Sequence, residues 1–266
     1  MPPARTALVT GATAGIGAAF ARRLAAEGRN LTLVARNESR LAEFAAELSG
    51  AHGVDVDVLP ADLSTIPGCA AVEERLRDPD ATLDILINNA GTSVNGSFLR
   101  TALLDEERML DLNVRAVLRL THSALPGMVR RGGGDIVNVA SVSGFGTVMA
   151  GSTYPASKSW VINFSESLAL AVRGSGVRVL ALCPGYTRTE FHDRAGIDMS
   201  GTPGWMWLAP GDVVDGALRD LRRGRLVSVP GWRYKAMVFG MRHAPVALVR
   251  RLAPDTRGRT PRPDPP

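Results

Sequence analysis

Hydrophobic residues recur along this 266-residue chain with two different periods. Short runs rich in Val, Leu, Ile and Ala predict buried strands, and the longer stretches between them, with apolar residues three and four positions apart, predict helices. The predicted strands cover residues 4–10, 31–35, 54–59, 83–88, 135–140, 177–183 and 225–229. Strands that alternate with helices in this way are typical of an α/β fold, a doubly wound seven-stranded parallel sheet with helices on both faces.

Composition gives no reason to divide the chain. With 45% hydrophobic and 21% charged residues, it can fill the core of a single domain. We expect that domain to cover residues 1–253, with a glycine-bearing lid at 189–210 and a C-terminal helical extension at 231–253. Residues 254–266, rich in Pro and Arg, predict a disordered tail.

In doubly wound sheets, ligands bind beyond the carboxyl ends of the strands. Six residues that follow predicted strands are therefore candidates for one site: Gly11, Arg36, Asp62, Asn89, Ser141 and Pro184. Gly11, Gly15 and Gly17 also open a helix, where they can turn tightly and admit a pyrophosphate to the positive helix end. Their spacing is G-x-x-x-G-x-G, and glycines alone are equally consistent with an ordinary turn.

Tyr154 and Lys158 lie one helical turn apart, which places phenol and ammonium group on the same face, about 5–6 Å apart at Cβ. A nearby cation favours the phenolate and lowers the pKa of a phenol from about 10. Tyr154 is therefore the candidate general acid and base. Ser141, at a strand end, is placed to stabilise negative charge that develops on a carbonyl oxygen. Ser143 competes with it, and either lines the pocket or belongs to a Ser-Gly-Phe-Gly turn.

Together these motifs resemble the shorter-subunit branch of the short-chain dehydrogenase/reductase family. The resemblance rests on Thr10-Gly-x-x-x-Gly-Ile-Gly17, Asn88-Asn-Ala-Gly91, Asn113, Ser141, Tyr154-x-x-x-Lys158 and Pro184-Gly185 followed by Thr189. It implies a single-domain Rossmann fold and a catalytic tetrad of Asn113, Ser141, Tyr154 and Lys158. It also implies a cofactor site of Gly11, Thr13, Gly15, Ile16, Gly17, Arg36, Asp62, Leu63, Asn89, Ala90, Gly91, Tyr154, Lys158, Pro184, Gly185, Thr187 and Thr189.

The resemblance further implies a role for each member of the tetrad. Tyr154 protonates the carbonyl oxygen while hydride leaves the nicotinamide, and Ser141 orients that oxygen. Lys158 holds the nicotinamide ribose and lowers the pKa of Tyr154. Asn113 positions a water that relays protons to Lys158.

The residue after the second strand indicates which nicotinamide cofactor binds. An acidic residue there would bind the ribose 2′-hydroxyl of NAD, whereas Arg36 can pair with the 2′-phosphate of NADP. The sequence therefore predicts NADP(H) in preference to NAD(H), although a solvated surface charge is the other reading of Arg36. Asp62 resembles the family residue that receives the adenine amino group, or it caps a helix expected to start near Ser64.

Six residues are candidates for the substrate pocket: Ser143, Phe145, Tyr186, Phe191, Trp205 and Trp207. The aromatic residues of the lid either contact an apolar substrate or pack on the core or a second subunit. We expect a fairly apolar ketone or acyl substrate. His192 is predicted to be a polar loop residue, because Tyr154 already supplies the acid and base.

The C-terminal extension carries apolar residues at helical spacing: Trp232, Tyr234, Met237, Val238, Met241, Leu248, Val249 and Leu252. We expect the core or a second subunit to cover them, and peripheral membrane contact ranks last. The extension contains no run long enough to span a bilayer. The family resemblance suggests a homodimer or homotetramer.

Charge and cysteine usage exclude several function classes. A net charge of +5 with scattered arginines and no recognition motif argues against nucleic-acid binding. Cys69 and Cys183 lack metal-ligand spacing, so we expect buried thiols and no metal site. The first ten residues predict a strand rather than a signal peptide, and the expected location is cytoplasmic.

Two functions from different classes remain. The favoured one is an NADPH-dependent carbonyl reductase, reversible as an alcohol dehydrogenase, acting on a 3-oxoacyl, steroid-like or xenobiotic carbonyl. The alternative is a catalytically idle NADP-binding sensor or assembly protein. Loss of Ser141, Tyr154 or Lys158 would favour the alternative, and all three are present.

Overall fold

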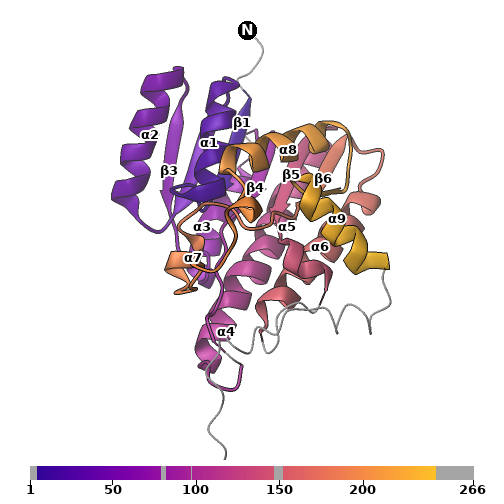
Figure 1. The fold of residues 1–266 in the computed structure, drawn as a ribbon. Helices are drawn as coiled ribbons and strands as arrows, with labels where there is room; N and C mark the ends of the chain where they lie inside the picture. The colour runs from indigo at the N-terminus through magenta and orange to yellow at the C-terminus, as the bar shows by residue number, and fades with distance from the viewer. Residues whose placement is uncertain (1–4, 79–81, 97, 147–151, 244–266) are drawn as a thin grey trace, which may run out of the picture.

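The computed structural model describes residues 5–78, 82–96, 98–146 and 152–243. Its strands form one sheet in the order β3-β2-β1-β4-β5-β6-β7, and every neighbouring pair is parallel. The strands are β1 (Thr6–Thr10), β2 (Asn30–Ala35), β3 (Val56–Pro60), β4 (Ile85–Asn88), β5 (Gly134–Val139), β6 (Val177–Leu182) and β7 (Val227–Ser228). This confirms the predicted doubly wound seven-stranded sheet (Figure 1). The seventh strand is shorter than predicted, with two residues.

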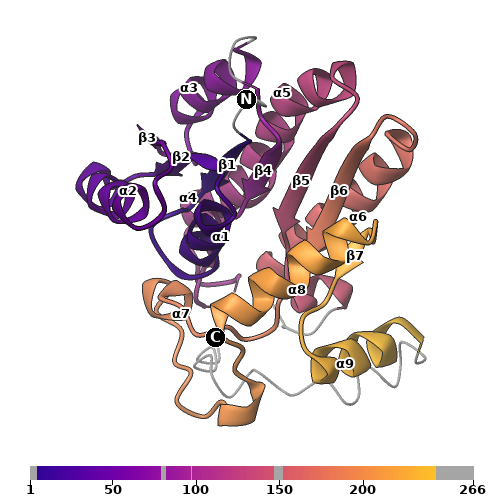
Figure 2. The same cartoon turned by 90° about the horizontal axis from the view of Figure 1, so that it is seen from above.

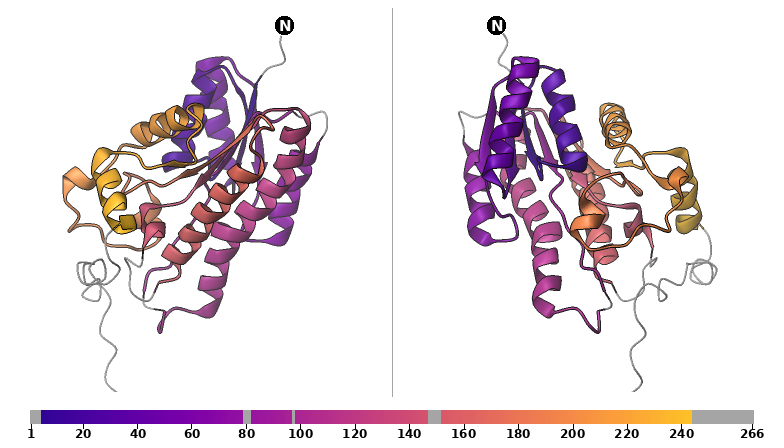
Figure 3. Two further views of the ribbon diagram at one scale, coloured as in Figure 1. Left: turned by 90° about the vertical axis from the view of Figure 1, so that its right-hand side faces the viewer. Right: turned by 60° about the vertical axis from the view of Figure 1, so that its left-hand side comes forward.

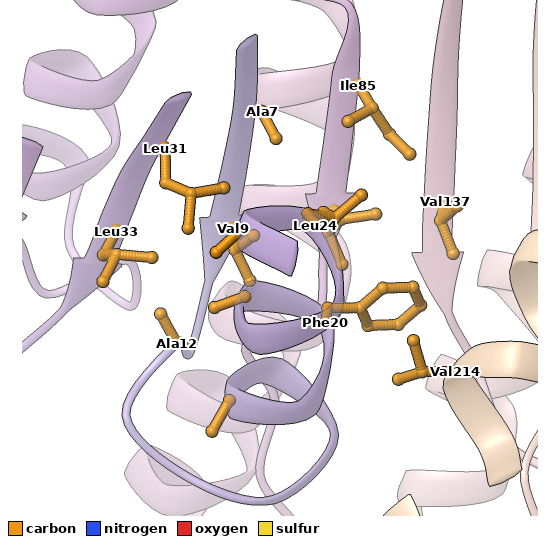
Figure 4. Packing of buried hydrophobic residues seen from close by; sticks show 14 of the residues in the cluster. Ala7, Val9, Ala12, Phe20, Leu24, Leu31, Leu33, Ile85, Val137 and Val214 are labelled. Atoms are coloured by element: carbon orange, nitrogen blue, oxygen red, sulfur yellow. The ribbon is translucent and has the colours of Figure 1, made fainter. Parts of the chain in front are cut away.

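One face of the sheet is covered by the helices α1 (Gly15–Ala26), α2 (Glu38–His52) and α8 (Pro210–Arg222). Alternate strand residues such as Val9 and Leu33 point to this face, because successive side chains of a strand point to opposite sides. Figure 4 shows Phe20 of α1 between the sheet and Val214 of α8. These contacts fix the start of α1 at the end of β1.

The opposite face is covered by the helices α3 (Ile66–Arg77), α5 (Ala116–Arg130) and α6 (Tyr154–Ala171). Leu8, Leu86 and Ile136 of the strands pack there against α3 and α5. Both cysteines are free and buried, as predicted. The helix α6 was expected to begin near Ser152 and begins two residues later.

The remaining helices lie around one end of the sheet. They are α4 (Leu103–Leu110), which continues through the π-helical turn η1 (Asp111–Arg115) into α5, the 3-10 turns η2 (Val142–Phe145) and η3 (Gly204–Met206), α7 (Phe191–Arg194) and α9 (Trp232–His243). Figures 2 and 3 show α7, η3 and α9 gathered on one side of the molecule. The lid and the C-terminal helix are therefore neighbours in space.

The C-terminal helix α9 packs on the chain's own core. Tyr234 and Val238 are buried against Val161 and Ile162 of α6. Core packing is thus confirmed for Tyr234 and Val238, but Trp232 and Met237 are exposed. Leu248, Val249, Leu252 and the tail at 254–266 lie outside the described residues. Within the described residues, no helix is long and apolar enough to cross a membrane.

Candidate active site

The glycine-rich turn between β1 and α1 has a shape that side chains would disrupt. Gly11 and Gly15 have φ of +62° and +54°, a region that favours glycine. A Cβ on Gly17 would lie 2.2 Å from the Gly11 carbonyl oxygen, and a Cβ on Gly15 would lie 2.7 Å from the Thr189 side chain. The N-cap residue of α1 is Ala14, and in the described part of the chain no side chain caps the first turn, so its N–H groups are available for an anion. The turn fits the pyrophosphate of a dinucleotide.

Thr10 and Asn89 hold this turn against the end of β4. The Thr10 hydroxyl accepts hydrogen bonds from the main-chain N–H groups of Asn89 and Ala90, at 2.9 and 3.0 Å. Asn89 Nδ2 donates to the carbonyl oxygens of Thr10 and Gly11. Asn89 therefore supports the cofactor turn through the main chain. Thr10 was not predicted as a site residue, although it opens the glycine motif.

Asn113 lies in η1 and is completely buried. Its Oδ1 accepts from Thr92 N–H, and its Nδ2 donates to the Thr92 carbonyl and to Ser157 Oγ, at 2.9 and 3.2 Å. A π-helical turn inside a longer helix is a frequent mark of functional sites. A Cβ on Gly91 would lie 3.1 Å from Asn113 Oδ1 and 3.3 Å from Lys158 Nζ, so these three predicted site residues are brought together.

Ser141 begins the η2 turn at the end of β5. Its Oγ accepts hydrogen bonds from Ser143 N–H at 3.2 Å and from the Ser143 hydroxyl at 3.0 Å. Gly144 packs directly on α6, because a Cβ there would lie 2.8 Å from the Lys158 carbonyl carbon. The structure thus places Ser143 in the predicted turn and brings Ser141 next to the catalytic helix.

Tyr154 and Lys158 lie on the first turns of α6, with Lys158 Nζ 5.7 Å from the centroid of the Tyr154 ring. Lys158 is 4% exposed, and its Nζ donates to the Val139 carbonyl oxygen at 3.0 Å. Burial raises the pKa of Tyr154 from 10.0 to about 12, and a hydrogen bond with Ser141 opposes this only in part. Burial lowers the pKa of Lys158 from 10.5 to about 8, with a smaller opposing effect from Cys183.

These shifts correct the prediction that Lys158 lowers the pKa of Tyr154. Helical spacing brings the two groups close together, but burial of the phenol is the largest cause of its pKa shift, and the net shift is upward. The phenol of Tyr154 therefore stays protonated at neutral pH. It is suited to donating a proton rather than to accepting one.

The outer rim of the site carries Arg36 and Asp62. Arg36 is exposed at the end of β2, and no ion pair of Arg36 is found within the described residues. Asp62 Oδ1 accepts from Ser64 N–H and from the Ser64 hydroxyl, and the following Leu63 is buried in the core. The prediction that Asp62 caps a helix is wrong, because α3 begins at Ile66 and Thr65 caps it.

The segment after β6 closes the site opposite the glycine turn. Thr189 contacts Gly15, and the buried Thr187 donates to the Gly185 carbonyl at 3.0 Å. Tyr234 of α9 packs so closely on Gly185 that a Cβ there would lie 2.0 Å from its ring. The Tyr234 hydroxyl also accepts from Tyr186 N–H and donates to the Met206 carbonyl. This tie between α9 and the lid involves a residue that the sequence had assigned only to helix packing.

Three of the predicted substrate residues form an aromatic group beside Tyr154. The Phe191 ring lies 6.0 Å from that of Tyr154, and the rings of Tyr186, Phe191 and Trp207 lie within 5.8 Å of His192. His192 was expected in a loop but lies half-buried in α7, and burial lowers its pKa. Its Nδ1 has no hydrogen-bond partner among the described residues.

Two further candidates lie apart from this aromatic group. Trp205 is 59% exposed, and the Arg233 guanidinium lies 5.3 Å from its ring centroid. Phe145 packs with the cluster between α6 and α9, and its ring faces Arg242. The described residues contain no group of His, Cys, Asp and Glu that could hold a metal ion.

Comparison with known proteins decides the family. Residues 5–199 match the family described as short chain dehydrogenase. The chain belongs to the short-chain dehydrogenase/reductase family. It is therefore an oxidoreductase that uses a nicotinamide cofactor.

Several members of the short-chain dehydrogenase/reductase family are similar to this chain. Ketoacyl reductase HetN of a Nostoc species is 35% identical over 68% of this chain and 63% of its own length, so less than two thirds of that relative is matched. A short-chain dehydrogenase from Sphingobium yanoikuyae, solved in complex with NADPH, has a TM-score of 0.84 and 39% identity, covering 94% of this chain and 97% of that one. The bulky-bulky ketone specific alcohol dehydrogenase from Comamonas testosteroni has a TM-score of 0.80 and 33% identity. The match covers 94% of this chain and 96% of that one.

Proposed function

We propose that this short-chain dehydrogenase/reductase is an NADPH-dependent reductase of apolar ketones, reversible as an alcohol dehydrogenase. One observation supports the proposal above all. Tyr154, with its pKa raised to about 12, lies between Ser141, Lys158 and an aromatic group at the carboxyl ends of the strands. A buried, protonated phenol beside a second hydroxyl is suited to protonating a carbonyl oxygen.

Each catalytic residue has a distinct task in this proposal. The reduced nicotinamide, when bound, supplies the hydride. Ser141 orients the carbonyl oxygen and stabilises the charge that develops on it. Once the carbonyl is reduced, its oxygen is a stronger base than a phenolate, and Tyr154 donates its phenolic proton to that oxygen. With its pKa lowered to about 8, Lys158 is still mainly protonated at neutral pH and presents a cation beside Gly91. Asn113 is held by Thr92 and Ser157 and lies with Lys158 beside Gly91.

The preference for NADP(H) rests on Arg36. Its exposed guanidinium follows β2, the position at which short-chain enzymes meet the adenosine ribose, and it has no ion-pair partner within the described residues. The neighbouring Arg40 is already paired with Glu190. We expect Arg36→Asp to weaken NADPH binding and improve NADH binding, with Arg40→Gln as the matched arginine control. Unchanged KM values for both cofactors in Arg36→Asp would refute the assignment.

The substrate class follows from the aromatic group of Tyr186, Phe191 and Trp207, which offers apolar contact beside Tyr154. We expect bulky apolar ketones to be better substrates than small charged carbonyls. The test is NADPH and NADH oxidation with a panel of 3-oxoacyl thioesters, keto-steroids, aromatic ketones and aldehydes. Activity confined to small charged carbonyls would contradict the proposed class.

The organisation of the chain also remains proposed. We expect one catalytic domain at 1–253 with the lid at 189–210, a homodimer or homotetramer, and a cytoplasmic location. Sedimentation of the purified protein would test the oligomeric state, and a monomer at micromolar concentration would contradict it.

A further inference from the structure

Glu106 is a buried carboxylate that the reaction described above does not use. It lies on α4 and is 5% exposed. Its Oε1 accepts the Thr101 hydroxyl at 2.7 Å, and its Oε2 accepts the Thr153 hydroxyl. No ion pair of Glu106 is found in the described parts of the chain. A buried carboxylate without a cation is costly, so stability alone gives no account of its presence on this helix.

Thr153 connects Glu106 to the catalytic helix. It precedes Tyr154 directly and occupies the N-cap position of α6. An N-cap threonine normally accepts a hydrogen bond from the first turn of its own helix. Thr153 makes no such bond, and its hydroxyl is instead donated to Glu106. The start of α6 is thus tied to α4.

A second tie joins the same two helices on the other side of Tyr154. Asn113 follows Glu106 by seven residues, on the continuous helical segment formed by α4 and η1. Its Nδ2 donates to Ser157 Oγ at 3.2 Å, and the Ser157 hydroxyl donates to the Tyr154 carbonyl at 2.7 Å. The segment formed by α4 and η1 therefore contacts α6 at two points, at Thr153 directly before Tyr154 and at Ser157 three residues after it.

We infer that Glu106 is a positioning residue for Tyr154, acting through Thr153. This inference rests on the proposed role of Tyr154 as proton donor. Without the Glu106 tie, the start of α6 loses its hydrogen bond to α4 directly before Tyr154, and the phenol is held less firmly relative to Ser141. Proton transfer depends steeply on such placement, and an error of about 1 Å can cost about 100-fold in rate.

The experiment compares Glu106→Ala with Glu107→Ala, which removes an exposed carboxylate from the next position of α4. We expect Glu106→Ala to lower kcat for ketone reduction by about tenfold to 100-fold. The KM for NADPH should stay the same, because the contacts of Glu106 lie away from the glycine turn. Glu106→Gln can still accept from one threonine hydroxyl and donate to the other, and should restore most of the kcat. Glu107→Ala should match the unmodified enzyme.

Two further measurements keep the test decisive. Thr153→Val removes the donor and leaves the carboxylate, so it should lower kcat as Glu106→Ala does, and the double variant should be no slower than either single one. Amide hydrogen exchange should be faster at residues 154–157 in Glu106→Ala, whether or not a substrate is known. If the unmodified protein reduces no ketone while that exchange is faster, the proposed function fails and the tie stands. Unmodified kcat and unchanged exchange in Glu106→Ala would overturn the inference, and so would additive losses in the double variant.

Discussion

Replacing Lys158 with methionine should change how the stability of the folded protein depends on pH. Lys158 is 4% exposed, and its pKa is lowered to about 8 in the folded protein from 10.5 in an unfolded chain. At a pH between these two pKa values, Lys158 is protonated in the unfolded chain and deprotonated in the folded protein. Stability rises with pH wherever the unfolded state binds more protons, so the contribution of Lys158 becomes more favourable from about pH 8 to 10.5.

The size of this effect follows from the same two values. The gap between 10.5 and about 8 corresponds to about 3 kcal/mol, at ~1.4 kcal/mol for each pKa unit. Burial raises the pKa of Tyr154, Cys69 and Cys183, and these groups act in the opposite direction at alkaline pH. They are present in both proteins, so their effect largely cancels in the comparison between unmodified protein and Lys158→Met. Only Cys183 also interacts with Lys158, and this interaction has a smaller effect on the pKa of Lys158 than burial has.

The assay is urea unfolding of both proteins at intervals from pH 7 to 10.5. We expect the free energy of unfolding of Lys158→Met, relative to that of the unmodified protein, to fall by about 3 kcal/mol over this range. Lys235→Met, which removes an exposed lysine, is the matched control. A difference for Lys158→Met that stays constant from pH 7 to 10.5 would refute the assignment of a buried lysine that loses its proton near pH 8.

Three further predictions concern the cofactor turn, the lid and the proton donor. Gly15→Ala should weaken NADPH binding by about tenfold or more, because its Cβ would lie 2.7 Å from Thr189 in the turn proposed to hold the pyrophosphate. Gly28→Ala, which has positive φ but nothing within 4 Å of the new Cβ, is the control for equilibrium titration, and equal Kd values for both variants would contradict the prediction. Tyr234→Phe should lower the free energy of urea unfolding by about 1–3 kcal/mol and raise the ketone KM, because the Tyr186 N–H and the Met206 carbonyl of the lid lose their hydroxyl partner. Unchanged stability and KM would count against this tie. Because the pKa of Tyr154 is raised to about 12, alcohol oxidation should still accelerate with pH above 10, and a plateau below pH 8 would show that another group is the base.

Much of the fold and the centre of the site could be predicted because their signals are local in the sequence. The strands are short apolar runs, and the spacing of Tyr154 and Lys158 encodes a shared helix face. The shape of the glycine turn likewise depends on residues within one short segment. These features need no knowledge of distant contacts, and the structure shows them where they were expected.

The features that the sequence did not predict depend on contacts between distant segments. Glu106 carries no motif, and its role depends on a helix that begins at Tyr154. Tyr234 reaches the lid only because α9 packs beside β6. The pKa of Tyr154 was predicted in the wrong direction, because helical spacing reveals the nearby cation but not the degree of burial.

The most direct test of the central claim compares the unmodified protein with Tyr154→Phe, which removes one phenolic oxygen. Both proteins are titrated with NADPH and then mixed with an apolar aromatic ketone while NADPH oxidation is followed. We predict that NADPH binds both proteins with similar affinity and that only the unmodified protein oxidises it at a measurable rate. Equal turnover by Tyr154→Phe would contradict the account, because the proton would then come from another group.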